Sequence, residues 1–286
     1  MRIPFERSPL RALHSIANGI YEYELTPTEG YENSRESLFV DGPRELGLQI
    51  QDACGELEVG LAVASWGNYF PEPHARFRLR LDFPGLLPGV ADEVIEAVRS
   101  HLVLAQSWSD ALRHALALDW YKVIEEDVDP NDWDYTEVGR LVHDAKYKHW
   151  TRAGRSAMDD LVDRLCAVIQ AHPLMREATA VTTPPSHNGE TSFAIRLTGL
   201  VARQLGIGFV RVIDEEGGHA PAKERETGAV ATSAYTFVCE DDCEGTIIVV
   251  DDLYRSGRSM AATAAAVSAV GADSVFGLAC TKTARN

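Results

Sequence analysis

The chain has 286 residues, of which 45% are hydrophobic and 24% are charged. This composition is typical of globular proteins and excludes wholesale disorder, and the length fits one large domain or two ordinary ones. The 43 acidic residues outnumber the 27 basic residues, so the formal net charge is −16. An acidic surface repels phosphate backbones and anionic lipids, which disfavours nucleic-acid and membrane partners but leaves room for a local basic patch.

Cysteine usage and the N-terminal segment predict a cytoplasmic protein. The cysteines are too few and too scattered for a disulfide framework, so we expect reduced thiols. They are Cys54, Cys166, Cys239, Cys243 and Cys280. The first residues, MRIPFERSPLRALHS, lack the apolar core of a signal peptide. No stretch approaches the ~18 consecutive apolar residues of a membrane helix.

Residues 1–134 predict an α+β domain of unknown role. Alternating apolar and polar residues indicate half-solvated strands at 21–25, 46–50, 57–63 and 77–83. Helical spacing follows at 94–102 and 108–116, and strands grouped before helices are typical of α+β domains. The acidic segment 125–134, EEDVDPNDWD, is interpreted as a linker. It lacks the alternating ligands, central glycine and closing glutamate of a calcium loop.

Three arginines form a basic stripe on one predicted strand. Arg76, Arg78 and Arg80 share a face because strand side chains alternate. We expect them to pair with acidic neighbouring strands, such as the one that carries Glu22 and Glu24. The alternative is that they bind a phosphate-bearing acceptor or nucleic acid.

Residues 135–286 change to alternating strands and helices. Helices are predicted at 138–145, at 158–169 with Ser156 and Asp159 capping its start, at 193–201 and at 260–270. Strands are predicted at 178–182, 206–213, 246–250 and 274–280. This alternation predicts an α/β domain with a mostly parallel sheet flanked by helices. Such sheets bind ligands beyond the carboxyl ends of their strands.

One segment of this domain carries recognisable chemistry. In TIIVVDDLYRSGRSM, residues 246–260, a buried strand ends in Asp251 and Asp252, and a small-residue loop then leads into a helix. Gly257 allows backbone N–H groups to converge, and a helix N-terminus favours a phosphate. Ser256 and Ser259 can add hydroxyl donors, and Ser259 can cap the helix. Two carboxylates beside a phosphate cup can accept hydrogen bonds from vicinal hydroxyls, so the segment fits a ribose 5-phosphate.

The segment IIVVDDLYRSGRS resembles the PRPP-binding signature of type I phosphoribosyltransferases. The chain is most similar to the ComF-like (amidophosphoribosyltransferase-like) family, over roughly residues 136–286. Three weaker segments agree in order: VHDAKYKH at 142–149, AVTTPPSHNGETSF at 180–193, and the C-terminal TKTARN. The resemblance implies a type I phosphoribosyltransferase fold for this domain.

The resemblance also implies roles for individual residues. Asp251 and Asp252 would bind the ribose 2′- and 3′-hydroxyls. The 5-phosphate would be bound by Arg255, Ser256, Gly257, Arg258 and Ser259, and Tyr254 would bind substrate beside them. The pyrophosphate would be bound by the turn Pro185, Ser186, His187, Asn188 and Gly189. Mg²⁺ would bridge the pyrophosphate and the ribose with few direct protein ligands, Asp251 and Asp252 being the candidates.

A further segment, 215–233, stands where the family has a mobile loop that closes over the active site. The resemblance implies that Lys223 or Arg225 meets the leaving pyrophosphate. A lid would exclude water from the oxocarbenium-like centre. The alternative is an ordinary surface loop.

The chain also departs from the family pattern. It lacks the Cys-rich zinc module with which ComF-like proteins begin, and its pyrophosphate turn carries only His187 as a basic residue. Arg255 stands where purine-salvage members have an aspartate, which disfavours a 6-oxopurine acceptor. We interpret Lys146 and Tyr147 as structural residues at the domain entry.

The sequence therefore predicts an enzyme that transfers 5-phosphoribosyl from PRPP to an unidentified acceptor, with Mg²⁺ and release of pyrophosphate. The alternative is a non-catalytic PRPP or nucleotide sensor, or a DNA-handling partner of the competence or defence type. A hydrolase of phosphoribosyl compounds is a lesser alternative. The resemblance is compatible with a homodimer.

Overall fold

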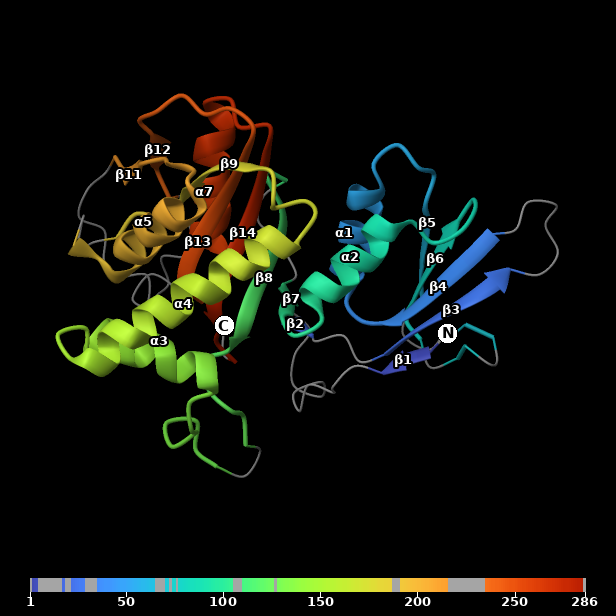
Figure 1. Ribbon diagram of the computed structural model, residues 1–286, viewed down its shortest axis with the longest axis horizontal. Helices are drawn as coiled ribbons and strands as arrows, with labels where there is room; N and C mark the ends of the chain where they lie inside the picture. Colours follow the sequence, from blue (N-terminus) through green and yellow to red (C-terminus); the bar gives the residue numbers. More distant parts are fainter. Residues whose placement is uncertain are drawn as a thin grey trace. The chain divides into compact units, whose positions relative to one another are not determined.

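The computed structural model describes residues 2–4, 17–18, 22–28, 35–64, 70–71, 74–75, 77–104, 110–125, 128–186, 191–215 and 235–284, with side chains from residue 36 onward (Figure 1). These residues divide into two compact units. The first unit contains Met1–Ala105, Ile124–Trp133 and Gln170–Arg176. The second contains Gln106–Val123, Asp134–Ile169 and Glu177–Asn286.

The first unit is an antiparallel sheet with two helices, as predicted for an α+β domain. The strand order is β1-β3-β4-β6-β5, and each printed pairing is antiparallel. The strands are β1 (Arg2–Pro4), β3 (Glu22–Thr28), β4 (Arg35–Asp41), β5 (Gly60–Val63) and β6 (Leu79–Phe83). The helices are α1 (Arg44–Cys54) and α2 (Gly89–Val98), and β2 (Ala17–Asn18) pairs with β7 (Leu102–Leu104).

Two predictions for the first half of the chain were wrong. Residues 46–50, predicted as a strand, belong to helix α1, because Leu46, Ile50 and Cys54 are buried at helical spacing. Residues 108–116, predicted as a helix, lead into strand β8 (Leu112–Trp120). Most side chains of β8 are buried, so the strand lacks the alternation that marks a half-solvated strand. The predicted helix 94–102 ends at Val98, and Leu102 begins β7.

Two arginines of the stripe, Arg78 and Arg80, pair with carboxylates, whereas the side chains of Glu22 and Glu24 lie outside the described part of the chain. Strand β4 lies between β3 and β6, so Asp41 is nearer to the stripe than Glu22 or Glu24. Arg78 Nε lies 4.0 Å from Asp41 Oδ1, and Arg80 Nε donates to Asp82 Oδ1 at 2.8 Å. Arg76 lies outside the described residues.

The second unit is built on five parallel strands in the order β10-β9-β13-β14-β8, which confirms the predicted parallel α/β sheet. Besides β8, the strands of this sheet are β9 (Ala178–Thr182), β10 (Gly208–Phe209), β13 (Thr246–Tyr254) and β14 (Ser274–Lys282). The flanking helices are α3 (Glu137–Tyr147), α4 (Arg152–Ala171), α5 (Phe193–Leu205) and α7 (Arg258–Ala269). A separate antiparallel pair joins β11 (Val212–Asp214) to β12 (Phe237–Cys239).

Several boundaries in the second unit differ from those predicted. Strand β8 lies before residue 134 but pairs with β14, so the chain passes between the units more than once. The predicted strand 206–213 divides into β10 and β11. Helix α4 begins at Arg152, ahead of Ser156 and Asp159, and Gly154 N donates to Thr151 Oγ1 at 3.0 Å. These two residues therefore do not cap its start.

The parallel register brings the strand ends that matter for function to one edge. Tyr254 of β13 lies opposite Lys282 of β14, which lies opposite Trp120 of β8. On the other side of β13, Thr182 of β9 lies opposite Val249. Strands β13 and β14 run side by side in the second unit (Figure 1). The carboxyl ends of β8, β14, β13 and β9 thus meet at the edge where this class of sheet binds ligands.

Two observations bear on the environment of the protein. Within the described ranges, no helix is both long enough and apolar enough to cross a membrane. All five cysteines are described and buried, and none forms a disulfide.

Burial and Asp163 raise the pKa of Cys166 to about 11. Burial, the neighbouring Cys239 thiol and acidic residues nearby raise the pKa of Cys243 to about 12. Burial also raises the pKa of Cys54 and of Cys280.

These thiols should resist alkylation in the folded protein. The thiolate is the nucleophile, and a pKa raised to about 11 leaves only about one thiol in a thousand ionised at pH 8. We expect iodoacetamide at pH 8 to modify Cys166 and Cys243 far more slowly in the native chain than in urea, as followed by mass spectrometry. Rapid labelling of either cysteine in the native chain would contradict this burial.

Candidate functional site

The two carboxylates of the predicted diol acceptor lie inside the last part of β13. The strand continues through both residues to Tyr254, so Asp251 and Asp252 are held by the sheet and do not lie in a loop. Asp252 N donates to Asp251 Oδ1 at 2.9 Å, and Thr281 Oγ1 of β14 donates to Asp252 O at 3.0 Å. The neighbouring strand therefore fixes the backbone that carries the carboxylates.

Lys146 of helix α3 contacts this pair. Its Nζ forms an ion pair and hydrogen bond with Asp252 Oδ2. The Lys146 side chain is 36% exposed and that of Asp252 is 14% exposed, so the contact is only partly open to water. Sequence reasoning treated Lys146 as a structural residue at the domain entry. Its place in the Lys-Tyr segment was the available signal, but the sequence does not show that residues 106 positions apart meet.

The pKa values follow from this crowding of charges. Burial raises the pKa of Asp251 well above its ordinary value, and the Asp252 carboxylate raises it further, whereas the Asp252 N–H and Lys146 lower it. Burial lowers the pKa of Lys146, but attraction to Asp252 outweighs it, so the pKa lies above its ordinary value. Lys146 is therefore an ammonium at neutral pH, and it partly offsets the repulsion between the two carboxyls.

Helix α3 packs closely against the end of β8 at Gly139. A Cβ on Gly139 would lie 1.9 Å from the Tyr121 carbonyl oxygen, so no side chain fits there. Thr136 caps the helix, since its Oγ1 accepts from Gly139 N at 2.9 Å and donates to Trp120 O. This backbone contact sets the position of the helix that carries Lys146.

The loop after β13 is the predicted phosphate-binding loop, and its residue Gly257 has a left-handed backbone conformation. Gly257 has φ 80° and ψ −1°, in the left-handed region that favours glycine, and it is the N-cap of α7. A Cβ at this position would lie 2.2 Å from the Tyr254 hydroxyl oxygen. Tyr254 is buried, with 2% of its surface exposed, so it supports the loop from within the protein.

The other residues of this loop are placed as follows. Partly exposed positions are Arg255, Ser256, Arg258 and Ser259. The prediction that Ser259 caps the helix was wrong, because α7 begins at Arg258. The Ser259 carbonyl accepts a hydrogen bond from Thr263 Oγ1 at 2.8 Å inside the helix.

The predicted pyrophosphate turn follows β9, the strand next to β13. Pro185 and Ser186 are partly exposed, whereas His187, Asn188 and Gly189 lie outside the described residues. Helix α5 begins just after the turn, where Ile195 N donates to Ser192 Oγ at 3.3 Å. The hydroxyls of Thr182 and Thr183 are buried at the end of β9 and have no hydrogen-bond partner among the described residues.

Lys223 and Arg225 also lie outside the described residues. The segment that carries them is bracketed by β11 and β12, which pair with Asp214 opposite Phe237. The two flanking strands therefore lie side by side, and both contact helix α7.

Within the described part of the chain, no group of three His, Cys, Asp or Glu residues could hold a metal ion.

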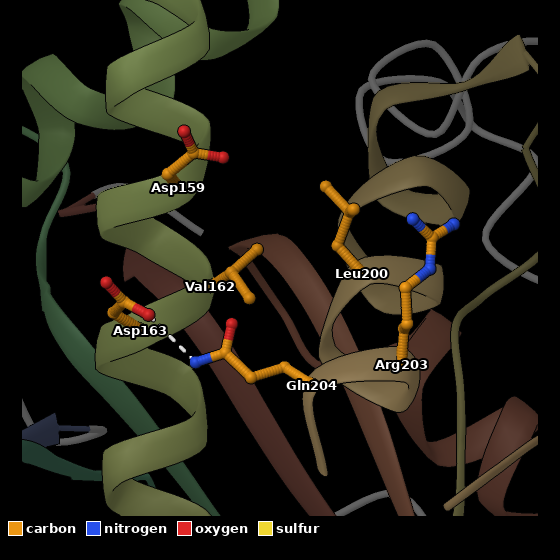
Figure 2. Close-up of a pocket in the computed structure, with 6 residues that line it drawn as sticks. All are labelled: Asp159, Val162, Asp163, Leu200, Arg203 and Gln204. Carbon is orange, nitrogen blue, oxygen red and sulfur yellow. Dashed lines mark hydrogen bonds between the residues drawn. The ribbon is translucent and has the colours of Figure 1, made fainter. Parts of the chain in front are cut away.

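A pocket of about 340 Å³ is lined by helices α4 and α5 (Figure 2). Its residues are Asp159, Val162, Asp163, Leu200, Arg203 and Gln204. Gln204 Nε2 donates to Asp163 Oδ1 at 2.8 Å across the pocket, and none of the residues predicted for the site lines it.

Comparisons with known proteins give limited likeness. No protein-family model matches the chain, and no curated protein does. An adenine phosphoribosyltransferase from Thermoanaerobacter pseudethanolicus ATCC 33223 is 23% identical, with a TM-score of 0.31, over 43% of this chain and 68% of that chain. An orotate phosphoribosyltransferase from Aeropyrum pernix is 18% identical, with a TM-score of 0.32, over 55% of this chain and 70% of that chain. These scores are too low to assign this chain a function.

The contact of Gly139 with Tyr121 predicts a stability effect. Gly139→Ala places a methyl group against a backbone carbonyl, so we expect it to lower the free energy of unfolding by about 1–3 kcal/mol, as measured in urea. The matched control is Gly199→Ala in α5, where the methyl group meets open space. It should leave stability unchanged or raise it by up to about 1 kcal/mol. Equal stability of the two variants would contradict the close packing of α3.

Proposed function

We propose that the second unit is a type I phosphoribosyltransferase domain of the ComF-like kind, which binds PRPP and transfers its 5-phosphoribosyl group. The observation that carries the proposal is the order of features along one strand-to-helix junction. Two carboxylates at the end of β13 are followed by the positive-φ Gly257 and the N-terminus of α7. This order supports the proposal, because two carboxylates that can accept hydrogen bonds from a diol are followed by a helix N-terminus that suits a phosphate.

In this proposal the sugar is held at both ends. The loop Arg255–Ser259 and the first N–H groups of α7 hold the 5-phosphate, because a helix N-terminus attracts anions. Asp251 and Asp252 accept hydrogen bonds from the 2′- and 3′-hydroxyls. Tyr254 acts indirectly, since its buried ring keeps Gly257 in position. Holding the sugar in this way orients C1 toward an acceptor, which lowers the entropic part of the barrier.

The transfer step breaks the bond between C1 and the pyrophosphate oxygen. Pyrophosphate leaves with the bonding electron pair, the acceptor's lone pair forms the new bond to C1, and the acceptor loses a proton to solvent. The turn Pro185–Gly189 and the cations Lys223 and Arg225 are proposed to stabilise the leaving pyrophosphate. Such stabilisation of developing charge is a large source of rate enhancement.

The donor set is compatible with Mg²⁺. Mg²⁺ prefers oxygen ligands and is held in many sites by one or two carboxylates together with substrate phosphates. Asp251 and Asp252 supply such oxygens, although Lys146 pairs with Asp252. When bound, the ion would neutralise pyrophosphate charge.

A second candidate function is a non-catalytic PRPP or nucleotide sensor, or a DNA-handling partner. The weakly basic turn Pro185–Gly189, with His187 as its one basic residue, favours it. Such a protein would use the same ribose and phosphate contacts without stabilising a leaving group.

Calorimetric titration with PRPP tests the binding site. We expect one site per chain, with tighter binding when Mg²⁺ is present. Asp252→Asn should weaken binding at least about tenfold, because a hydrogen bond to a charged group contributes about 1.5–3 kcal/mol. The control Asp160→Asn changes an exposed carboxylate of α4 and should bind as the unmodified chain does. Unchanged affinity in Asp252→Asn would remove Asp252 from the site.

Pyrophosphate release separates the enzyme from the sensor. With PRPP and Mg²⁺ present, we expect nucleobases or amines of at least one class to accelerate pyrophosphate release, and Asp252→Asn to abolish the acceleration. Tight PRPP binding with no release across these acceptors would instead support the sensor.

A further inference from the structure

Lys146 occupies the carboxylate that the proposed function assigns to a ribose hydroxyl. Its ammonium donates to Asp252 Oδ2, and only 14% of the Asp252 side chain is exposed. A carboxylate has about four lone-pair sites on its two oxygens, so an arriving hydroxyl can take a place beside the ammonium or replace it at Oδ2. Ligand binding must therefore either share Asp252 or displace Lys146.

The ammonium has a second neighbour at the start of helix α5. Lys146 Nζ lies 5.9 Å from the centre of the Phe193 ring. Phe193 is the first residue of α5, which begins directly after the turn proposed to hold pyrophosphate. Lys146 thus lies between the carboxylate pair and the start of that helix. Its side chain is 36% exposed, so the ammonium retains access to a ligand.

The charge balance of the site favours the same movement. The turn Pro185–Gly189 contains one basic residue, His187, whereas a diphosphate carries several negative charges. Together with Lys223, Arg225 and the Mg²⁺ proposed above, a cation already present beside the ribose site can supply positive charge that the turn itself lacks. Lys146 is suited to this, because a lysine ammonium is a compact charge on a flexible stem.

We propose that Lys146 is a substrate-binding residue that exchanges partners. Resting on the proposed function, it pairs with Asp252 in the empty site and turns to a diphosphate oxygen of PRPP when the ribose hydroxyls take over Asp252. The chain would thereby discriminate PRPP from ribose 5-phosphate, which offers the same hydroxyls but no diphosphate. No covalent bond changes in this exchange.

The test compares the two ligands in variants of Lys146. Lys146→Gln should weaken PRPP binding at least about tenfold by calorimetry, as expected for loss of a charge-assisted hydrogen bond. Its affinity for ribose 5-phosphate should fall less than about threefold or increase, because the competing ammonium is gone. Lys146→Arg, which keeps the positive charge, should recover most of the PRPP affinity.

Lys148→Gln is the matched control. Lys148 lies two positions on and pairs with Asp144 Oδ1 at 2.7 Å, so both ligands should bind this variant as they bind the unmodified chain. Thermal unfolding verifies that each variant is folded, and Lys146→Met, which keeps the aliphatic stem, replaces Lys146→Gln if the latter unfolds.

The outcomes separate this inference from the proposed function. Equal weakening of both ligands in folded Lys146→Gln would mean that Lys146 only holds the carboxylates, and no weakening would mean that it does not touch substrate. Either result overturns the exchange while leaving PRPP binding intact. If the unmodified chain binds neither PRPP nor ribose 5-phosphate, the proposed function and this inference are overturned together.

Discussion

Repulsion between two neighbouring carboxyls at a partly buried strand end is the constraint on which the site depends. Strand β13 pairs with β14, Asp252 N donates to Asp251 Oδ1 and Thr281 Oγ1 donates to Asp252 O, so Asp251 and Asp252 cannot move apart freely. Burial raises the pKa of Asp251, the repulsion from Asp252 raises it further, and Lys146 offsets part of this rise. Helix α3 must therefore lie close to the carboxyl edge of the sheet, and the bare backbone of Gly139 permits that approach.

The same edge explains why one glycine and one buried tyrosine matter in the following loop. Gly257 adopts a positive φ, and the Tyr254 hydroxyl occupies the space that a side chain there would need. Tyr254 therefore supports the loop. The carboxylates, the loop and the start of α7 follow one another without interruption. A ligand with a diol and a phosphate a few bonds apart suits that arrangement.

The sequence predicted the parallel sheet well and its edges poorly. Strand β9 was predicted with its observed bounds, Ala178–Thr182. Strand β13 was predicted because it begins with a run of β-branched residues, which favours a strand. Strand β8 was missed because an apolar run buried on both faces has no alternation to distinguish it from a helix. The two carboxylates and Gly257 could be proposed as site residues from the sequence because they lie in one short segment of it. Lys146 was not, since its contact with Asp252 exists only after α3 packs against β8.

The central claim is that Asp251 and Asp252 bind a ribose diol beside a phosphate. The most direct measurement is the affinity of the full chain for ribose 5-phosphate against 2-deoxyribose 5-phosphate, by calorimetry under identical conditions. The account predicts at least about tenfold weaker binding of the deoxy sugar, because it lacks one hydroxyl that donates to a charged acceptor. Equal affinity for the two sugars, or no binding of either, would contradict it.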